Sequence, residues 1–258
     1  MTAEPARRPG LFTRNDGRDR VAVPFGTGVL SALGAIGIQL LITFILVFIL
    51  AIAAFMRTHK SPAINGGDPW ITSIELLSYL AAGWFAWSKL RGTGRAVFRR
   101  LTRADLRTIL IGVGALIVVR IATALLLVAT HQTNHVQTGF EHFDVISKVP
   151  WVTALAVGLT VITIVFVAPI VEEMIFRGLL FGALAPRMGV LAAALVVALL
   201  FGAAHLDAVL FPTLAGLGFI SALAYASGGN LWTSVTLHTL NNALGAVVLI
   251  TTTFRHAH

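Results

Sequence analysis

Ionisable and amide side chains lie inside apolar stretches that are long enough to cross a membrane. Five of these side chains can carry charge and the sixth is an amide: Glu172, Glu173, Arg177, His205, His238 and Asn242. A charged group near the centre of a bilayer costs about 2.5–3.5 kcal/mol on insertion scales. A chain that carries several therefore has partners and a use for them, and acid, base and amide groups together are typical of hydrolytic chemistry.

The composition excludes a soluble globular domain. Hydrophobic residues make up 57% of the chain, charged residues 12%, and the mean hydropathy is +0.86, which indicates an integral membrane protein. The formal net charge of +8 does not indicate nucleic-acid binding, because most basic residues form two blocks beside apolar segments, without interleaved aromatic residues. The absence of cysteine excludes disulfides, thiolate catalysis and cysteine-based zinc sites.

Seven apolar segments predict an all-α, polytopic membrane bundle, because roughly 20 apolar residues span about 30 Å of hydrocarbon. The expected transmembrane helices are 25–56, 70–88, 108–130, 151–185, 189–206, 209–227 and 231–254. Three regions follow from this pattern. They are a disordered basic cytoplasmic tail (1–24), a set of N-terminal transmembrane helices (25–149) and a catalytic helical core (150–254).

The distribution of basic residues predicts the orientation. Segment 89–107 contains seven basic residues, whereas 57–69 and 131–150 contain few. The positive-inside rule therefore places 89–107 and the N-terminus in the cytoplasm. Alternation of the helices then makes the turns near Pro186 and Gly229 cytoplasmic. We expect a multi-pass protein of the cell membrane that contacts the lipid bilayer.

The stretch from Glu172 to Arg177 carries the sharpest local signal. Glu173 and Arg177 are four residues apart on a helix and can pair, while Glu172 points about 100° away and has no local cation. Pro169 predicts a bend just before the two acids, because proline removes a backbone hydrogen bond. We expect Glu173 to be structural and Glu172 to be reactive, although a helix end with an ordinary salt bridge would show the same local pattern.

Two further motifs lie at a similar depth. His205 ends an apolar segment, and His238 and Asn242 share one helical face at a spacing of four residues. At about 1.5 Å per residue, Glu172 and His205 lie about 21–24 Å from their shared cytoplasmic turn, and the other two about 12–18 Å from theirs. A kink or a tilt is enough to bring all four together.

Together these groups predict water activation beside a polarised carbonyl group. Glu172 would take a proton from water, and His205 would hold that water or share the proton. His238 and Asn242 could donate hydrogen bonds to the oxyanion of a tetrahedral intermediate. The expected reaction is hydrolysis of a peptide bond in a peptide or a membrane-protein substrate.

Other readings of these residues stay open. Glu172, His205 and His238 could instead hold a zinc ion with one open position, although no His-Glu-x-x-His helix is present. A Gly-x-Ser-x-Gly elbow is also missing, which disfavours a serine mechanism. A noncatalytic binding or immunity protein could use the same cavity, and an ion-coupled transporter is a weaker alternative because no internal repeat is evident. The motifs do not specify an oligomeric state.

Residues 150–250 resemble the CAAX-protease and bacteriocin-processing family (CPBP, or Abi) of intramembrane proteases. The resemblance rests on Glu-Glu-x-x-x-Arg from Glu172, Phe-x-x-x-His ending at His205, and His-x-x-x-Asn from His238, in that order on successive apolar segments. Segment 225–232, which reads Tyr-Ala-Ser-Gly-Gly-Asn-Leu-Trp, also resembles the family. Each motif alone is weak, but the ordered set is specific.

The resemblance implies a helical membrane fold with a conical catalytic cavity that faces the cytoplasm. It implies glutamate-dependent cleavage with or without metal, the same water-activating and oxyanion pairs, and a supporting role for Glu173 and Arg177. The composition is rich in arginine, alanine and glycine and favours a bacterial member, for which a prenylated substrate is the less expected case.

Overall fold

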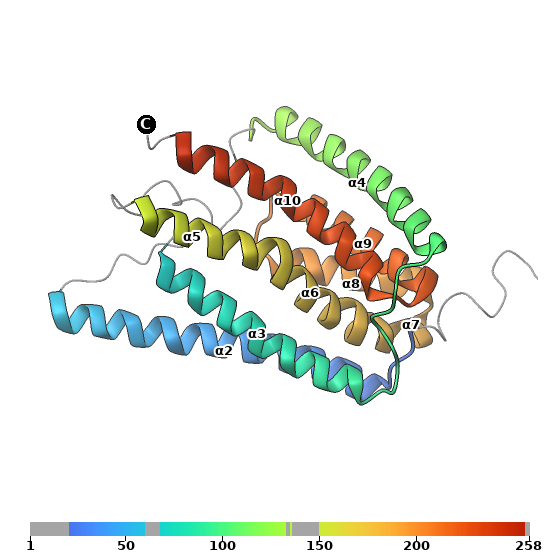
Figure 1. Ribbon diagram of the computed structural model, residues 1–258. Coiled ribbons are helices and arrows are strands. Elements are labelled where there is room, and N and C mark those ends of the chain that lie inside the picture. Colours follow the sequence, from blue (N-terminus) through green and yellow to red (C-terminus); the bar gives the residue numbers. More distant parts are fainter. Residues whose placement is uncertain (1–20, 60–67, 133–134, 136–149, 256–258) are drawn as a thin grey trace, which may run out of the picture.

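The chain folds into a bundle of helices (Figure 1), and the computed structural model describes residues 21–59, 68–132, 135 and 150–255. Within these residues there is no strand, and a helix forms at each of the seven predicted segments. The elements are α2 (Phe25–Thr58), α3 (Pro69–Arg91), α4 (Arg103–Ala129), α5 (Pro150–Ile162), η2 (Thr163–Val167), α6 (Ala168–Glu173), η3 (Met174–Phe181), α7 (Gly182–Met188), α8 (Val190–Ala204), α9 (Phe211–Gly228) and α10 (Leu231–Arg255). The predicted all-α class is confirmed.

Length and composition identify the helices that could cross a membrane. Four stretches qualify among the described residues, namely α2, α4, α9 and the continuous stretch Trp151–Met188. Helix α8 is apolar but shorter. Helices α3 and α10, with 23 and 25 residues, are long enough but carry more polar side chains. The polar groups of the predicted site lie on Trp151–Met188, at the end of α8 and on α10.

The stretch that carries the two glutamates changes its helical register twice. Two π-helical segments, η2 and η3, flank the short α-helix α6. A π turn bonds residues five apart and is frequent at functional sites. Pro169 lacks an N–H group, and in the π register the missing donor is the one that would reach the carbonyl oxygen of Ile164. The proline predicted to bend this helix therefore leaves a backbone acceptor free.

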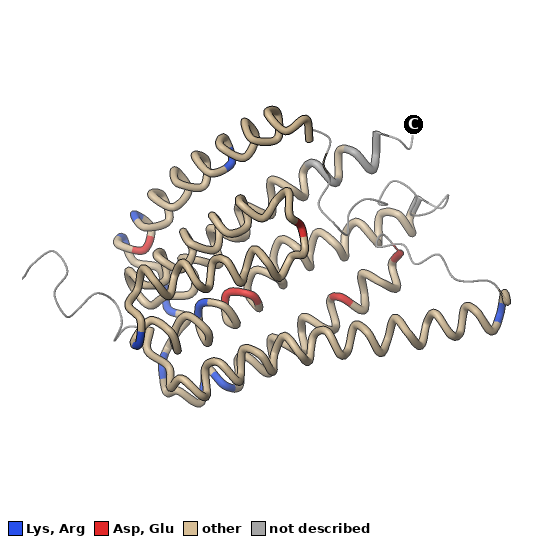
Figure 2. The backbone as a smooth tube through the Cα atoms, turned by 180° about the vertical axis from the view of Figure 1, so that it is seen from behind, with Lys and Arg blue, Asp and Glu red and all other residues tan. Residues whose placement is uncertain are grey.

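Most of the described lysine and arginine residues lie at one end of the bundle, as Figure 2 shows. Segment 92–102 joins α3 to α4 at this end and is tied to the turn between α9 and α10. The N–H of Leu231 donates to Val97 over 2.8 Å, and the Arg99 guanidinium donates to the carbonyl oxygen of Gly228 over 2.5 Å. We call this end the basic end.

Residues 21–24 pack against the bundle, so the predicted tail ends earlier than residue 24. Val21 and Val23 are buried, and the Val23 N–H donates to the carbonyl oxygen of Gly182 over 2.9 Å. A Cβ atom on Gly182 would collide with the Val21 carbonyl oxygen, so only glycine permits this close approach. Burial of the two valines offsets the cost of ordering the segment. Residues 1–20 lie outside the described part.

Candidate active site

A buried ion pair forms the base of the site. Nη1 of Arg177 donates to Oε1 of Glu173 over 2.8 Å, and both side chains have 0% exposure. Nη2 of Arg177 donates to the carbonyl oxygen of Gly218 on α9 over 3.1 Å, and the guanidinium lies 4.6 Å above the Phe201 ring. The predicted pairing is therefore present, and it joins η3 to α8 and α9.

His238 lies between the two glutamates. Its Nδ1 atom is 3.0 Å from Oε1 of Glu173, and its Nε2 atom is 3.8 Å from Oε2 of Glu172. A carboxylate oxygen can only accept, so Nδ1 of His238 donates to Glu173. The 3.8 Å separation exceeds the length of a direct hydrogen bond. The imidazole ring is thus held by Glu173 and faces Glu172.

Tyr79 on α3 is a site residue that the sequence motifs did not reveal. Its hydroxyl group donates to Oε1 of Glu172 over 2.8 Å. The other oxygen, Oε2, is buried and has no hydrogen-bond partner among the described residues. The only sequence signal was that Tyr79 is one of two tyrosines in the chain and sits inside an apolar segment. Glu172 therefore has one oxygen fixed and one available.

Replacing Tyr79 with Phe is expected to lower the turnover number for peptide cleavage by about 10- to 100-fold, because a hydrogen bond to a charged group contributes about 1.5–3 kcal/mol. The loss should fall on kcat rather than KM, since the hydroxyl group orients Glu172 and not the substrate. Steady-state kinetics of the purified variant measure both constants. Tyr225→Phe, the only other tyrosine change, is the matched control, and equal rates for the two variants would contradict this role of Tyr79.

His205 caps the end of α8 and contacts the cluster through Phe201. Its Nδ1 atom lies 2.8 Å from the Phe201 carbonyl oxygen, which can only accept, so a neutral ring keeps an acceptor lone pair on Nε2. The Phe201 ring centroid lies 4.8 Å from that of His205 and 5.4 Å from that of His238. The described structure records no direct bond between His205 and Glu172, so their predicted partnership is not a contact here.

Asn242 is held by a network that starts at Arg120 on α4. The Arg120 guanidinium donates to Asn241 at Oδ1 (2.8 and 3.2 Å) and at the backbone oxygen (2.8 Å). Asn241 donates from Nδ2 to Oδ1 of Asn242 over 3.1 Å, and Asn242 donates from Nδ2 to the freed carbonyl oxygen of Ile164 over 2.8 Å. An amide nitrogen carries two hydrogens, so one hydrogen of Asn242 remains available.

The predicted zinc ligands do not form a three-ligand set. Among the described residues, no three His, Asp or Glu side chains lie together as metal ligands. Glu172 and His238 approach each other, but the contacts of His205 are with Phe201. This arrangement of the described residues does not fit the zinc site that the sequence left open.

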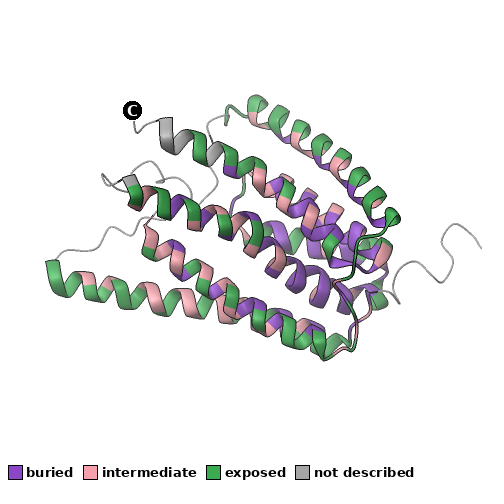
Figure 3. Ribbon diagram, viewed as in Figure 1, coloured by how far each residue is buried: buried purple, intermediate pink, exposed green. Residues whose placement is uncertain are grey.

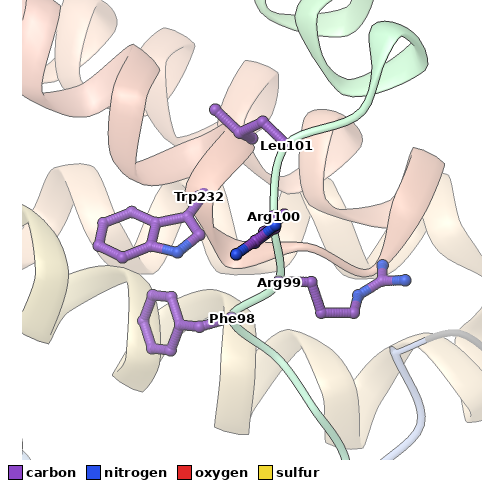
Figure 4. A pocket seen from close by; sticks show the side chains of 5 residues that line it. All are labelled: Phe98, Arg99, Arg100, Leu101 and Trp232. Atoms are coloured by element: carbon purple, nitrogen blue, oxygen red, sulfur yellow. The ribbon is translucent and has the colours of Figure 1, made fainter.

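A shallow depression at the basic end is separate from the site (Figure 4). The residues that line it are Phe98, Arg99, Arg100, Leu101 and Trp232. The Phe98 and Trp232 rings are 4.9 Å apart between centroids. None of the predicted site residues lines this depression, so it takes no part in the chemistry considered below.

The fold and the polar cluster define a polytopic helical membrane protein with a glutamate, histidine and asparagine site inside its bundle. Residues 154–244 match the family described as "Type II CAAX prenyl endopeptidase Rce1-like". The chain is 32% identical over 93 residues to the "Putative membrane peptidase YdiL" of Bacillus subtilis (strain 168), a match that covers 36% of this chain and 38% of that protein. No solved structure matches. The helical core of the chain is thus similar to the CAAX-protease family, and the match spans well under half of this chain and of the Bacillus subtilis relative.

Proposed function

We propose that this chain is an intramembrane peptidase in which Glu172 activates water for hydrolysis of a peptide bond. The main support is the Oε2 atom of Glu172, which is buried, has no hydrogen-bond partner among the described residues and lies 3.8 Å from Nε2 of His238. Such a separation between two polar atoms suits one bridging water molecule. The match to a family of endopeptidases and the similarity to a protein described as a membrane peptidase support the reaction class.

The reaction would begin at the water molecule between Glu172 and His238. Its oxygen attacks the carbonyl carbon of the scissile bond while one of its protons moves to Glu172. Tyr79 holds the Oε1 atom of Glu172, so that the Oε2 atom faces the water molecule. The Nε2 lone pair of His205 would accept a hydrogen bond from the second hydrogen of that water molecule. The C–N bond then breaks, and the proton passes from Glu172 to the leaving amine.

Asn242 and His238 would stabilise the oxyanion that forms on the carbonyl oxygen. Asn242 has one amide hydrogen left after its bond to Ile164. His238 donates from Nδ1 to Glu173, and in its doubly protonated form its Nε2–H group would donate to the oxyanion.

The substrate in this proposal is a peptide or a segment of a membrane protein. We place the chain in the cell membrane as a multi-pass protein with a cytoplasmic N-terminus, which the seven basic residues of segment 89–107 support. A prenyl group on the substrate is not required by any contact described above.

The test of this function is cleavage of a mixed library of lipidated and unlipidated peptides by the detergent-purified protein. Cleavage is expected to persist after treatment with EDTA and with 1,10-phenanthroline, because the described residues form no three-ligand metal set. Loss of cleavage on chelation, restored by added zinc, would replace the metal-free mechanism with a zinc-assisted one. Binding of library peptides to the protein without any cleavage would contradict the peptidase function and favour a noncatalytic binding protein.

A further inference from the structure

Arg120 is a charged residue of α4 to which the proposed reaction gives no role. It is half-buried and lies in a helix that is long and apolar enough to cross a membrane. Among the described residues no carboxylate pairs with Arg120, and its hydrogen bonds go to Asn241 on α10. An ionisable group is costly at such a place and marks a functional residue by default.

The packing of α4 against α9 fixes the backbone that carries Arg120. A Cβ atom on Gly216 of α9 would lie 2.8 Å from Cγ1 of Val119, the residue before Arg120. Three residues after Arg120, the Thr123 hydroxyl group accepts a hydrogen bond from Thr213 of α9 over 2.6 Å. Much of α4 is otherwise exposed (Figure 3). These contacts therefore set where the guanidinium group begins its reach toward α10.

The hydrogen bonds that start at Arg120 run in a single direction. A guanidinium group can only donate, and a backbone carbonyl oxygen can only accept. Oδ1 of Asn241 accepts from Nε and Nη2 of Arg120 over 3.2 and 2.8 Å. Nδ2 of Asn241 then donates to Oδ1 of Asn242 over 3.1 Å. Nδ2 of Asn242 ends the chain by donating to the carbonyl oxygen of Ile164 over 2.8 Å.

The two ends of this chain determine which way the amide of Asn242 points. The oxygen and nitrogen ends of an amide have almost the same shape, so only hydrogen-bond partners distinguish them. In a flipped amide, Oδ1 of Asn242 would face the carbonyl oxygen of Ile164. Its NH2 group would face the NH2 group of Asn241. Like groups would oppose each other at both contacts, so the observed orientation is the one that Arg120 and Ile164 permit.

This orientation is the one that an oxyanion requires. An oxyanion is stabilised by an N–H donor and repelled by an amide oxygen. The charge of Arg120 adds to the effect, because charged donors make stronger hydrogen bonds and hydrogen bonds in a chain polarise one another. Asn241 is only 7% exposed, which limits competition from water. The chain thus makes Nδ2 of Asn242 a better donor.

We propose that Arg120 and Asn241 are positioning residues for peptide hydrolysis, because they hold the amide of Asn242 with an N–H group available to the oxyanion. Neither residue touches a reacting atom. Arg120 also lies outside residues 154–244, which match the family, so the motifs of the matched segment do not reveal it. This inference rests on the proposed peptidase function and on the placement of Asn242 beside the oxyanion.

Asn241→Asp separates positioning from stability. Aspartate keeps the acceptor for Arg120 and adds an ion pair, but a carboxylate has no hydrogen to donate to Asn242. We expect kcat to fall about 10- to 100-fold, less than the roughly 10²–10³-fold that follows outright removal of an oxyanion donor. KM and the thermal unfolding temperature should not fall. A variant that cleaves as fast as the wild-type protein would overturn the proposal.

Arg120→Met tests whether the arginine acts through Asn242. In the wild-type background we expect a loss of about 10- to 100-fold in kcat, again smaller than the loss of a donor. In the Asn242→Ala background no amide is left to orient, so the same change should cost no more than about twofold, since residues that act as a unit are not additive. Full losses in both backgrounds would overturn the proposal.

Thr123→Val is the matched control, because it removes another polar contact of α4 and leaves the chain from Arg120 intact. Its kcat is expected to stay within about twofold of the wild-type value, as for substitutions away from the site. A loss equal to that of Arg120→Met would assign the effect to the packing of α4 and overturn the positioning role.

The two proposals fail in distinguishable ways. A wild-type protein that cleaves no peptide of the library would overturn both the peptidase function and the positioning role that rests on it. An active wild-type protein matched in kcat by Arg120→Met and Asn241→Asp would keep the peptidase function and overturn the positioning role alone.

Discussion

Replacing Glu172 with Gln is expected to reduce the rate of peptide cleavage by about 10²–10⁴-fold, the range that a positioned general base contributes. Glutamine keeps the size of the side chain and can still accept the hydrogen bond from Tyr79, but it cannot take a proton from water. Folding should change little. Single-turnover kinetics are measured on a library peptide that the wild-type protein cleaves. Thermal unfolding of the same preparation then separates a loss of catalytic rate from a loss of stability.

Glu75→Gln is the matched control for this experiment. Glu75 is another acidic residue of a predicted span, but it is exposed on α3, one helical turn before Tyr79. Its substitution is expected to change the rate by no more than about twofold, as for other exposed positions. A Glu172→Gln protein that cleaves as fast as this control would remove Glu172 from the role of base.

Replacing Arg177 with Met is expected to lower the free energy of unfolding by about 3–5 kcal/mol, because removal of one partner leaves an uncompensated buried charge. Glu173 has 0% exposure and cannot reach water to recover its hydration. The change also removes the hydrogen bond to Gly218 that joins η3 to α9. Chemical unfolding in detergent, followed by circular dichroism, measures the loss.

The double variant Glu173→Gln/Arg177→Met separates the charge from the packing. It removes both members of the pair, so it should be more stable than Arg177→Met alone. If the single variant proves the more stable of the two, the penalty comes from lost packing against Phe201 and not from an unpaired carboxylate. Wild-type stability in Arg177→Met would contradict the buried ion pair itself.

The positions of the helices and one of the ion pairs could be predicted from the sequence, because both depend on local spacing. Apolar runs mark the helices, and a spacing of four residues brings Glu173 and Arg177 together. Tyr79 could not be predicted in this way, since it meets Glu172 across 93 positions of the chain. A pair of that kind depends on how α3 packs against α6, which no local pattern encodes.

The π-helical segments could likewise not be predicted from the sequence pattern. Pro169 indicated a disturbance, but proline can produce a kink, a break or a change of register. Only the packed structure shows that the carbonyl oxygen of Ile164 is the acceptor taken up by Asn242. The partner of the half-buried Arg120 could not be predicted for the same reason, because Asn241 comes from a helix that is distant in sequence.

Glu173 links the stability of the fold to the geometry of the site, because its Oε1 atom accepts hydrogen bonds from both Arg177 and His238. In a genetic screen that scores only loss of function, changes at Glu173 would rank beside changes at Glu172, although Glu173 touches no reacting atom in the proposed mechanism. Natural sequence variation is expected to show that Glu173 is retained even where Glu172 is not. A lineage that abandons the chemistry is free to lose Glu172, whereas loss of Glu173 would also require a rebuilt interior.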